Sequence, residues 1–165
     1  MTATVELLVM RHAKAAWPDG VGDHDRPLAE RGRRDAPQVG RWLGEQGLVP
    51  DLVLCSDAFR TRETAALVLQ GLAETGAVDV PVQPTADLYE ASVESVLNVV
   101  AGVPEDIRRV LVVGHEPTSS QVTAVLTGSA PTFPTAAVAV VALSGRWGDV
   151  APGSGSLQAF RTPKG

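Results

Sequence analysis

The chain has 165 residues, of which 44% are hydrophobic and 20% charged, a balance typical of a folded globular domain and not of a disordered segment. Its net charge of −5 and its pI near 5.1 argue against nucleic acid or an anionic membrane as a partner, because both need concentrated basic surface. The longest apolar run, residues 136–143, is too short to span a bilayer, so we expect a single domain over residues 1–165 with no membrane partner.

The first predicted element is a buried strand over residues 5–10, which read V-E-L-L-V-M. The run ends abruptly in Arg11 and His12, so the strand delivers an imidazole and a guanidinium to one point at the edge of a sheet. Taken alone, this pair is explained more simply by an arginine that pairs with an acid and a histidine that caps a loop. Residues 18–27 combine Gly, Asp and Pro and are predicted to form a loop.

The spacing of Ala36, Val39 and Leu43 predicts a helix that ends near residue 47. Pro37 conflicts with this pattern, because a proline in a helix interior costs about 3 kcal/mol. We therefore expect Pro37 in a first turn capped by Asp35, or at a kink that follows a shorter turn.

Strands and helices alternate along the rest of the chain. The remaining predicted elements are a strand over residues 52–55, a helix over 62–72, a weak strand over 80–82, a helix capped by Ser92, a strand over 110–113, a helix over 118–126, a strand over 137–143 and an edge strand over 156–161. This order predicts a three-layer α/β fold with a mostly parallel central sheet and helices on both faces. Functional sites of such folds form at the carboxyl ends of strands, and three of these ends carry Arg11 with His12, residues 56–60, and His115.

Three motifs at these strand ends belong together. Residues 10–13 read M-R-H-A, residues 56–65 read S-D-A-F-R-T-R-E-T-A, and residues 114–115 read G-H. The set resembles the histidine phosphatase superfamily, whose members carry R-H-G or R-H-A after the first strand, S-x-x-x-R with R-x-x-x-T-A character after the second, and a later G-H or S-H. Residues 25–28, D-R-P-L, and 30–32, E-R-G, look like the small SixA-type branch of phosphohistidine phosphatases. The resemblance implies a phosphoglycerate mutase-like fold, here without a large cap insertion.

By this resemblance His12 is the nucleophile, while Arg11, Arg60 and His115 hold the phosphoryl group. The chemistry of the side chains agrees, because arginine is always charged and its planar fork can bind two phosphoryl oxygens at once. Nearby guanidinium groups also favour the neutral form of His12 that an attack on phosphorus requires. These cations supply the positive charge that a metal would otherwise provide, so no metal or other cofactor is expected.

Other residues leave alternatives open. Residues 88–90, L-Y-E, resemble a motif whose glutamate is the general acid in mutase-like branches, so Glu90 is the candidate acid, with Asp87 or a merely solvated loop carboxylate as alternatives. Arg26 is a candidate substrate-binding residue. Arg62 either reaches the phosphate or forms an ion pair with a neighbouring acid on the helix surface.

Two further patterns point to other enzymes but are incomplete. A cysteine phosphatase needs an arginine six residues after its cysteine, and the residue six beyond Cys55 is Thr61. Cys55 is therefore interpreted as a buried strand residue, and a lone cysteine fits a reducing compartment, which favours the cytoplasm. Residues 23–25, D-H-D, superficially resemble a metal site, but no other ligands accompany them and they are interpreted as a polar loop.

The short span between Glu90 and His115 leaves no room for a lid, so we expect an open site. An open pocket without a clearly marked general acid suits a phosphoryl group that projects from a macromolecule. Protein phosphohistidine is the favoured substrate, because its P–N bond breaks without strong protonation of the leaving group. The alternative enzyme is a phosphatase for small phosphate esters or nucleotides. A non-catalytic phosphate-dependent binding module is a third possibility, and the intact set of Arg11, His12, Arg60 and His115 argues against it.

Overall fold

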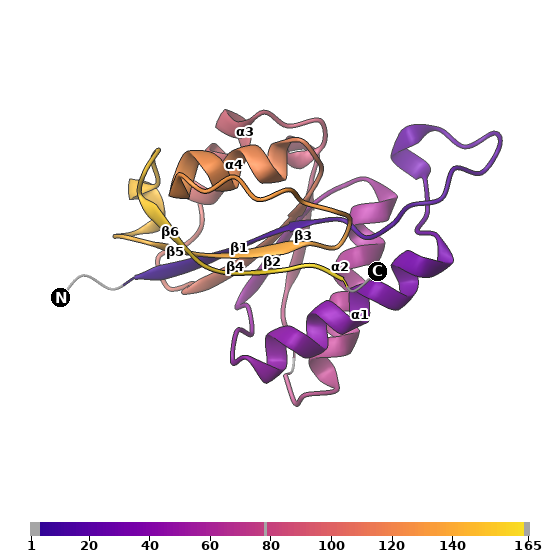
Figure 1. The fold of residues 1–165 in the computed structure, drawn as a ribbon, viewed down its shortest axis with the longest axis horizontal. Helices are drawn as coiled ribbons and strands as arrows, with labels where there is room; N and C mark the ends of the chain where they lie inside the picture. The colour runs from indigo at the N-terminus through magenta and orange to yellow at the C-terminus, as the bar shows by residue number, and fades with distance from the viewer. Residues whose placement is uncertain (1–3, 78, 164–165) are drawn as a thin grey trace.

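The computed structural model describes residues 4–77 and 79–163. Its centre is a six-stranded sheet with the order β3-β2-β4-β1-β5-β6 (Figure 1). The strands are β1 (Val5–Arg11), β2 (Leu52–Ser56), β3 (Val82–Thr85), β4 (Arg109–Gly114), β5 (Val138–Leu143) and β6 (Gly155–Arg161). Strands β3, β2, β4 and β1 run parallel, and β5 is antiparallel to both of its neighbours. The predicted mostly parallel sheet is confirmed.

Helices cover both faces of the sheet, as the alternation of elements predicts (Figure 1). They are α1 (Glu30–Glu45), α2 (Phe59–Ala73), α3 (Val93–Ala101) and α4 (Thr118–Thr127), with short 3-10 turns η1 (Asp23–Asp25), η2 (Ala86–Leu88) and η3 (Trp147–Asp149). Helices α1 and α2 pack on one face, where they meet Leu8 and Met10 of β1. Helices α3 and α4 pack on the other face, where they meet Leu7 and Val9. Because successive strand residues point to opposite faces, the apolar run in β1 anchors both layers.

Of the two expectations for Pro37, a first turn capped by Asp35 is wrong. Helix α1 begins at Glu30, so Pro37 lies in its interior and Asp35 does not cap it. Helices α1 and α2 approach each other closely at Gly40 and Gly71, where an added Cβ atom would collide with the backbone of the other helix. Burial of the apolar face of α1 between α2 and the sheet offsets the cost of the internal proline.

The parallel strands place three chemically active segments at one edge of the sheet. Strands β2, β4 and β1 are neighbours, and their carboxyl ends are Ser56, Gly114 and Arg11. The backbone N–H of His12 donates to the carbonyl of Gly114 at 3.0 Å, which continues the pairing of β1 with β4 beyond the last strand residue. His12 and His115 therefore leave adjacent strands at the same level. In the part of the chain that the structure describes, no helix has the length and apolar character needed to cross a membrane.

Candidate active site

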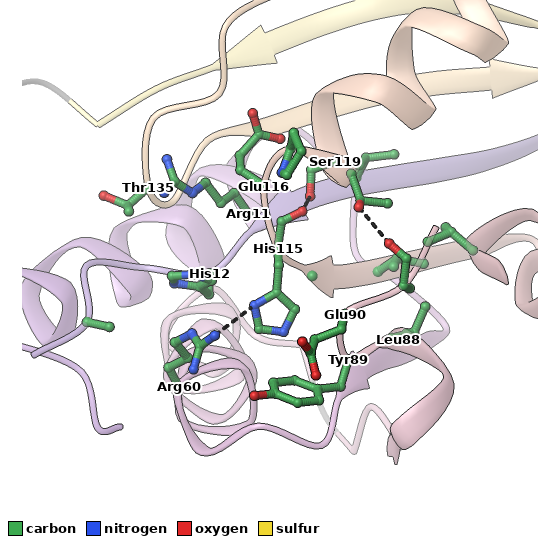
Figure 2. A pocket seen from close by; sticks show the side chains of 18 of the residues that line it. Arg11, His12, Arg60, Leu88, Tyr89, Glu90, His115, Glu116, Ser119 and Thr135 are labelled. Atoms are coloured by element: carbon green, nitrogen blue, oxygen red, sulfur yellow. Dashed lines mark hydrogen bonds between the residues drawn. The ribbon is translucent and has the colours of Figure 1, made fainter. Parts of the chain in front are cut away.

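A pocket of about 520 Å³ opens at the carboxyl ends of β1 and β4 (Figure 2). Its wall combines the strand ends with the loop before α1, the start of α2, the turn after η2 and the start of α4. The lining residues with polar or charged side chains are Arg11, His12, Lys14, Asp23, Arg26, Arg60, Tyr89, Glu90, His115, Glu116, Thr118, Ser119 and Thr135. The structure thus brings together Arg11, His12, Arg60, His115, Glu90 and Arg26, which are all the site residues predicted from the sequence.

His12 is buried, and its ring is fixed by one hydrogen bond. Its Nδ1 lies 2.7 Å from the carbonyl oxygen of Ala13, which can only accept, so Nδ1 carries the hydrogen and Nε2 keeps its lone pair. Burial lowers the pKa of His12 to about 3, and the charges of Arg60 and Arg11 act in the same direction. At neutral pH the ring is uncharged, with Nε2 available as a nucleophile.

His115 lies opposite His12, with 5.3 Å between the ring centroids. The guanidinium Nη2 of Arg60 donates to Nδ1 of His115 at 3.3 Å, and Nε2 of His115 lies 2.9 Å from the hydroxyl oxygen of Ser56. Because Nδ1 accepts, Nε2 carries the hydrogen and donates to Ser56. Burial lowers the pKa of His115 to about 4, with Arg60 as the second cause, so this ring is also neutral at pH 7.

Arg11 and Arg60 bring two guanidinium groups to the pocket from different elements. Arg11 ends β1 and donates through Nη1 to the carbonyl of Phe133 at 3.0 Å. Arg60 lies in the first turn of α2 and donates through Nη1 to the backbone carbonyl of Asp23 at 2.7 Å. The Nε atoms of both arginines are buried without a hydrogen-bond partner. Burial lowers the pKa of Arg11, but a guanidinium stays charged in proteins, so the pocket holds positive charge that is only partly compensated.

Asp23 is a pocket residue that the sequence does not single out, because residues 23–25 have the pattern of a polar loop. Its carboxylate accepts from Arg60 at 3.2 Å, from Arg26 at 3.3 Å and from the hydroxyl of Tyr89 at 2.6 Å. The bond from Tyr89, followed by the charge of Arg60, lowers the pKa of Asp23 to about 2. Asp23 therefore stays ionised and fixes both arginines. A D-x-x-R spacing before the first helix was the available signal.

Arg26 and Arg62 have different surroundings. Arg26 is buried in the pocket wall, where its Nε donates to the carbonyl of Ala16 at 3.0 Å. Arg62 is exposed, does not line the pocket and donates to the backbone carbonyl of Asp57 at 3.0 Å. The geometry makes Arg26, and not Arg62, available to a ligand in this pocket.

Of the two candidate acids, Glu90 and Asp87, only Glu90 belongs to the pocket. Glu90 lines the pocket, and in Figure 2 its carboxylate lies between His115 and Tyr89. Its backbone has a φ of 52°, an uncommon value for a residue with a side chain and one that persists where the surroundings enforce it. Asp87, in η2, does not line this pocket.

Cys55 is buried in β2 and does not line the pocket. Burial raises the pKa of its thiol to about 11, so it is a protonated, inert side chain at neutral pH. Within residues 4–77 and 79–163, no three side chains of the types His, Cys, Asp and Glu are grouped so that they could hold a metal ion. The chemistry of the pocket is that of paired histidines among arginines.

Comparisons with known proteins show a family and relatives that cover most of the chain. A family model described as histidine phosphatase superfamily (branch 1) matches residues 7–97. An uncharacterised protein of Mycobacterium tuberculosis (strain ATCC 25618 / H37Rv) is 42% identical over 166 residues, which cover 94% of this chain and 100% of the relative.

Two solved structures extend the likeness over nearly the whole fold. One is a protein from Nakamurella multipartitia described as a candidate phosphohistidine phosphatase SixA, with a TM-score of 0.87, 33% identity and 99% of each chain covered. The other is the protein histidine phosphatase SixA in complex with tungstate, with a TM-score of 0.79, 25% identity, and 94% of this chain and 96% of that chain covered.

Proposed function

The chain belongs to the histidine phosphatase superfamily, and we propose that it is a metal-independent phosphatase that hydrolyses protein phosphohistidine through a phosphohistidine intermediate on His12. The observation that carries the proposal is the state of His12. Its Nδ1–H is tied to the carbonyl of Ala13, and its Nε2 is unprotonated in a pocket shared with Arg11 and Arg60. A neutral imidazole among fixed cations is suited to attack an anionic phosphoryl group.

The reaction proceeds in two displacements. Nε2 of His12 attacks phosphorus in line, a new N–P bond forms, and the bond from phosphorus to the substrate breaks with its electron pair going to the leaving imidazole, which takes up a proton. Water then attacks the phosphorus on His12, releases inorganic phosphate and returns the neutral ring. The hydrogen bond from Nδ1 to Ala13 keeps the ring oriented in both steps and stabilises the positive charge that develops on it.

The arginines bind the charge that spreads over the phosphoryl oxygens. Arg11 and Arg60 are held by bonds to backbone carbonyls, so their donors are in place before a substrate arrives. Donors fixed in this way stabilise a transferring phosphoryl group without the cost of reorganisation. Arg60 and Arg26 both donate to the carboxylate of Asp23, which keeps the two guanidinium groups oriented toward the incoming phosphoryl group. A bound tungstate in a similar structure, a tetrahedral oxyanion like phosphate, supports this role for the pocket.

The choice of phosphohistidine as substrate rests on two supports. Of the two similar solved structures, one is described as a candidate phosphohistidine phosphatase SixA and the other as the protein histidine phosphatase SixA. An imidazole also leaves phosphorus more easily than an alkoxide does, so its removal makes little demand on an acid such as Glu90. The deciding experiment is a hydrolysis panel of a phosphohistidine protein, a phosphoserine peptide and small phosphate esters. Faster turnover of the phosphohistidine protein supports the proposal, and faster turnover of the esters contradicts it.

The protonation of His12 gives a prediction that needs no substrate. A histidine with the usual pKa of about 6.5 is almost fully protonated at pH 5. Because the pKa of His12 is lowered to about 3, its ring should remain neutral from pH 8 down to pH 5. In an NMR titration, the carbon-bound ring protons of His12, assigned by their absence in His12→Ala, should not shift over this range. A midpoint near 6.5 for this resonance would contradict the proposed nucleophile.

A second candidate function is the hydrolysis of small phosphate esters, which the position of Glu90 in the pocket favours. If Glu90 is the general acid, Glu90→Gln should slow ester hydrolysis by about 10² to 10⁴, because an alkoxide needs a proton as it leaves. Phosphohistidine hydrolysis should be spared. Steady-state kinetics on both substrates measure the contrast, with Asp87→Asn as the matched control outside the pocket.

The contrast between the two substrates also separates the other roles of Glu90. Small and equal effects would make Glu90 a solvated loop residue and strengthen the phosphohistidine assignment. Large and equal effects would mean that it orients water or the pocket. If the wild type hydrolyses esters faster than phosphohistidine, and if this reaction depends on Glu90, the substrate is an ester and not phosphohistidine.

A further inference from the structure

Trp17 has an unusual environment at the rim of the pocket. It lines the pocket and yet its residue is 74% exposed, whereas tryptophan is among the most buried residue types on average. Its ring lies over the guanidinium of Arg26, with 3.2 Å from the guanidinium carbon to the ring centroid. The exposed ring is therefore held in a defined place by a buried partner.

Arg26 is itself fixed, which makes the arrangement rigid. Its Nε donates to the carbonyl of Ala16, and its Nη1 donates to Asp23. The exposed ring of Trp17 thus contacts Arg26, and Arg26 and Arg60 both donate hydrogen bonds to Asp23. An aromatic side chain that is ordered before binding loses little entropy when a partner covers it.

Two other exposed apolar residues are near pocket residues in the sequence. Four large apolar residues in the described part of the chain are exposed, and Trp17 is by far the most exposed of them: Trp17, Val21, Phe59 and Val82. Val21 belongs to the loop that carries Asp23, and Phe59 precedes Arg60 in α2. Val82 is the exception, because it begins β3 at the amino end of the sheet and the pocket is at the carboxyl end. Of these four residues Trp17 alone lines the pocket, and it places exposed apolar surface at the rim.

This rim is suited to the part of a substrate that lies outside the phosphoryl pocket. The face of an aromatic ring is electron-rich, so it offers nothing to the phosphoryl oxygens, which the arginines and His115 bind. Trp17 is largely exposed to solvent. A small molecule bound inside the pocket would leave its ring uncovered. A folded protein that presents a phosphohistidine would cover it.

We propose that Trp17 is a specificity-determining contact for the polypeptide that carries the phosphohistidine, and that it binds the protein surface around the modified side chain and not the phosphoryl group. The inference rests on the proposed function, because it requires a protein substrate. Buried aromatic anchors contribute a large share of the binding free energy at protein interfaces. Trp17 would therefore set KM for the protein substrate and leave the chemical step to His12.

The test compares three substrates that share a P–N bond: phosphoramidate, free phosphohistidine and a phosphohistidine protein. For Trp17→Ala we expect kcat/KM for the protein to fall about tenfold or more, mainly through KM, as for truncation of an aromatic anchor. The values for phosphoramidate and free phosphohistidine should stay close to wild type. Trp17→Phe keeps a ring over Arg26 and should recover most of the loss, and Val82→Ala should change nothing.

The other outcomes overturn the inference in different ways. An equal loss on all three substrates would mean that Trp17 acts by holding Arg26 in place. A loss shared by free phosphohistidine would mean that the ring contacts the imidazole and not the polypeptide. Unchanged kinetics on a protein that the wild type hydrolyses would refute only the role of Trp17. Failure of the wild type to hydrolyse any phosphohistidine protein would refute the proposed function and this inference together.

Discussion

His12→Ala should reduce hydrolysis of every substrate by about 10⁴-fold or more, the range seen when a covalent nucleophile is removed from an otherwise intact site. The expected loss is large because no other side chain can take over. His115 lies 5.3 Å away between ring centroids, but its Nδ1 accepts from Arg60 and its Nε2 donates to Ser56, so neither nitrogen is free to attack. Steady-state turnover of phosphoramidate by purified variant and wild type measures the change.

Two controls separate lost chemistry from lost structure. His12→Ala should keep the wild-type circular dichroism and melting temperature, because it removes a side chain that faces a pocket and not the core. His24→Ala, the one histidine outside the pocket, should retain turnover. Wild-type protein quenched during turnover should carry acid-labile, base-stable phosphate on His12. Phosphate on Cys55 or on an aspartate, or persistent turnover in His12→Ala, would contradict the mechanism.

The strand ends could be predicted from the sequence because the signal there is local. A short apolar run such as residues 5–10 is typical of a strand buried between two helical layers, and the polar residues that follow it are expected at the end of that strand. This pattern places Arg11, His12 and His115 at strand ends. Their meeting in one pocket then follows from parallel neighbours, since β1 and β4 pair in register up to Arg11 and Gly114.

The loop before α1 could not be interpreted in the same way. Asp23 and Tyr89 are far apart in the chain, and their hydrogen bond depends on how the loop folds back over α2. Neither a loop aspartate nor a tyrosine beside a candidate acid carries a periodic pattern. The start of α1 also could not be predicted, because its first turns consist mostly of charged residues and lack apolar periodicity. Its close packing on α2 depends on Gly40 and Gly71, which add nothing to an apolar pattern.

Arg60→Ala should lower kcat by about 10² to 10³, the cost expected when one preorganised charged donor is removed from a developing anionic charge. Arg60 is 6% exposed and is held by Asp23 on one side and by His115 on the other, so no solvent-exposed lysine or arginine can replace it. Arg60→Lys should restore only part of the rate, because an ammonium group keeps the charge but lacks the planar fork.

The matched control for Arg60 lies two residues along the same helix. Arg62→Ala removes the same side chain from an exposed position that does not line the pocket, and it should leave kcat near wild type.

A second measurement tests the electrostatic role of Arg60 directly. The charge of Arg60 lowers the pKa of both His12 and His115, so Arg60→Ala should move both NMR titration midpoints upward. Since a neutral His12 is the nucleophile, activity that remains should be lost at a higher pH than in the wild type as the solution is acidified. A near-normal rate with unchanged histidine midpoints would remove Arg60 from the site.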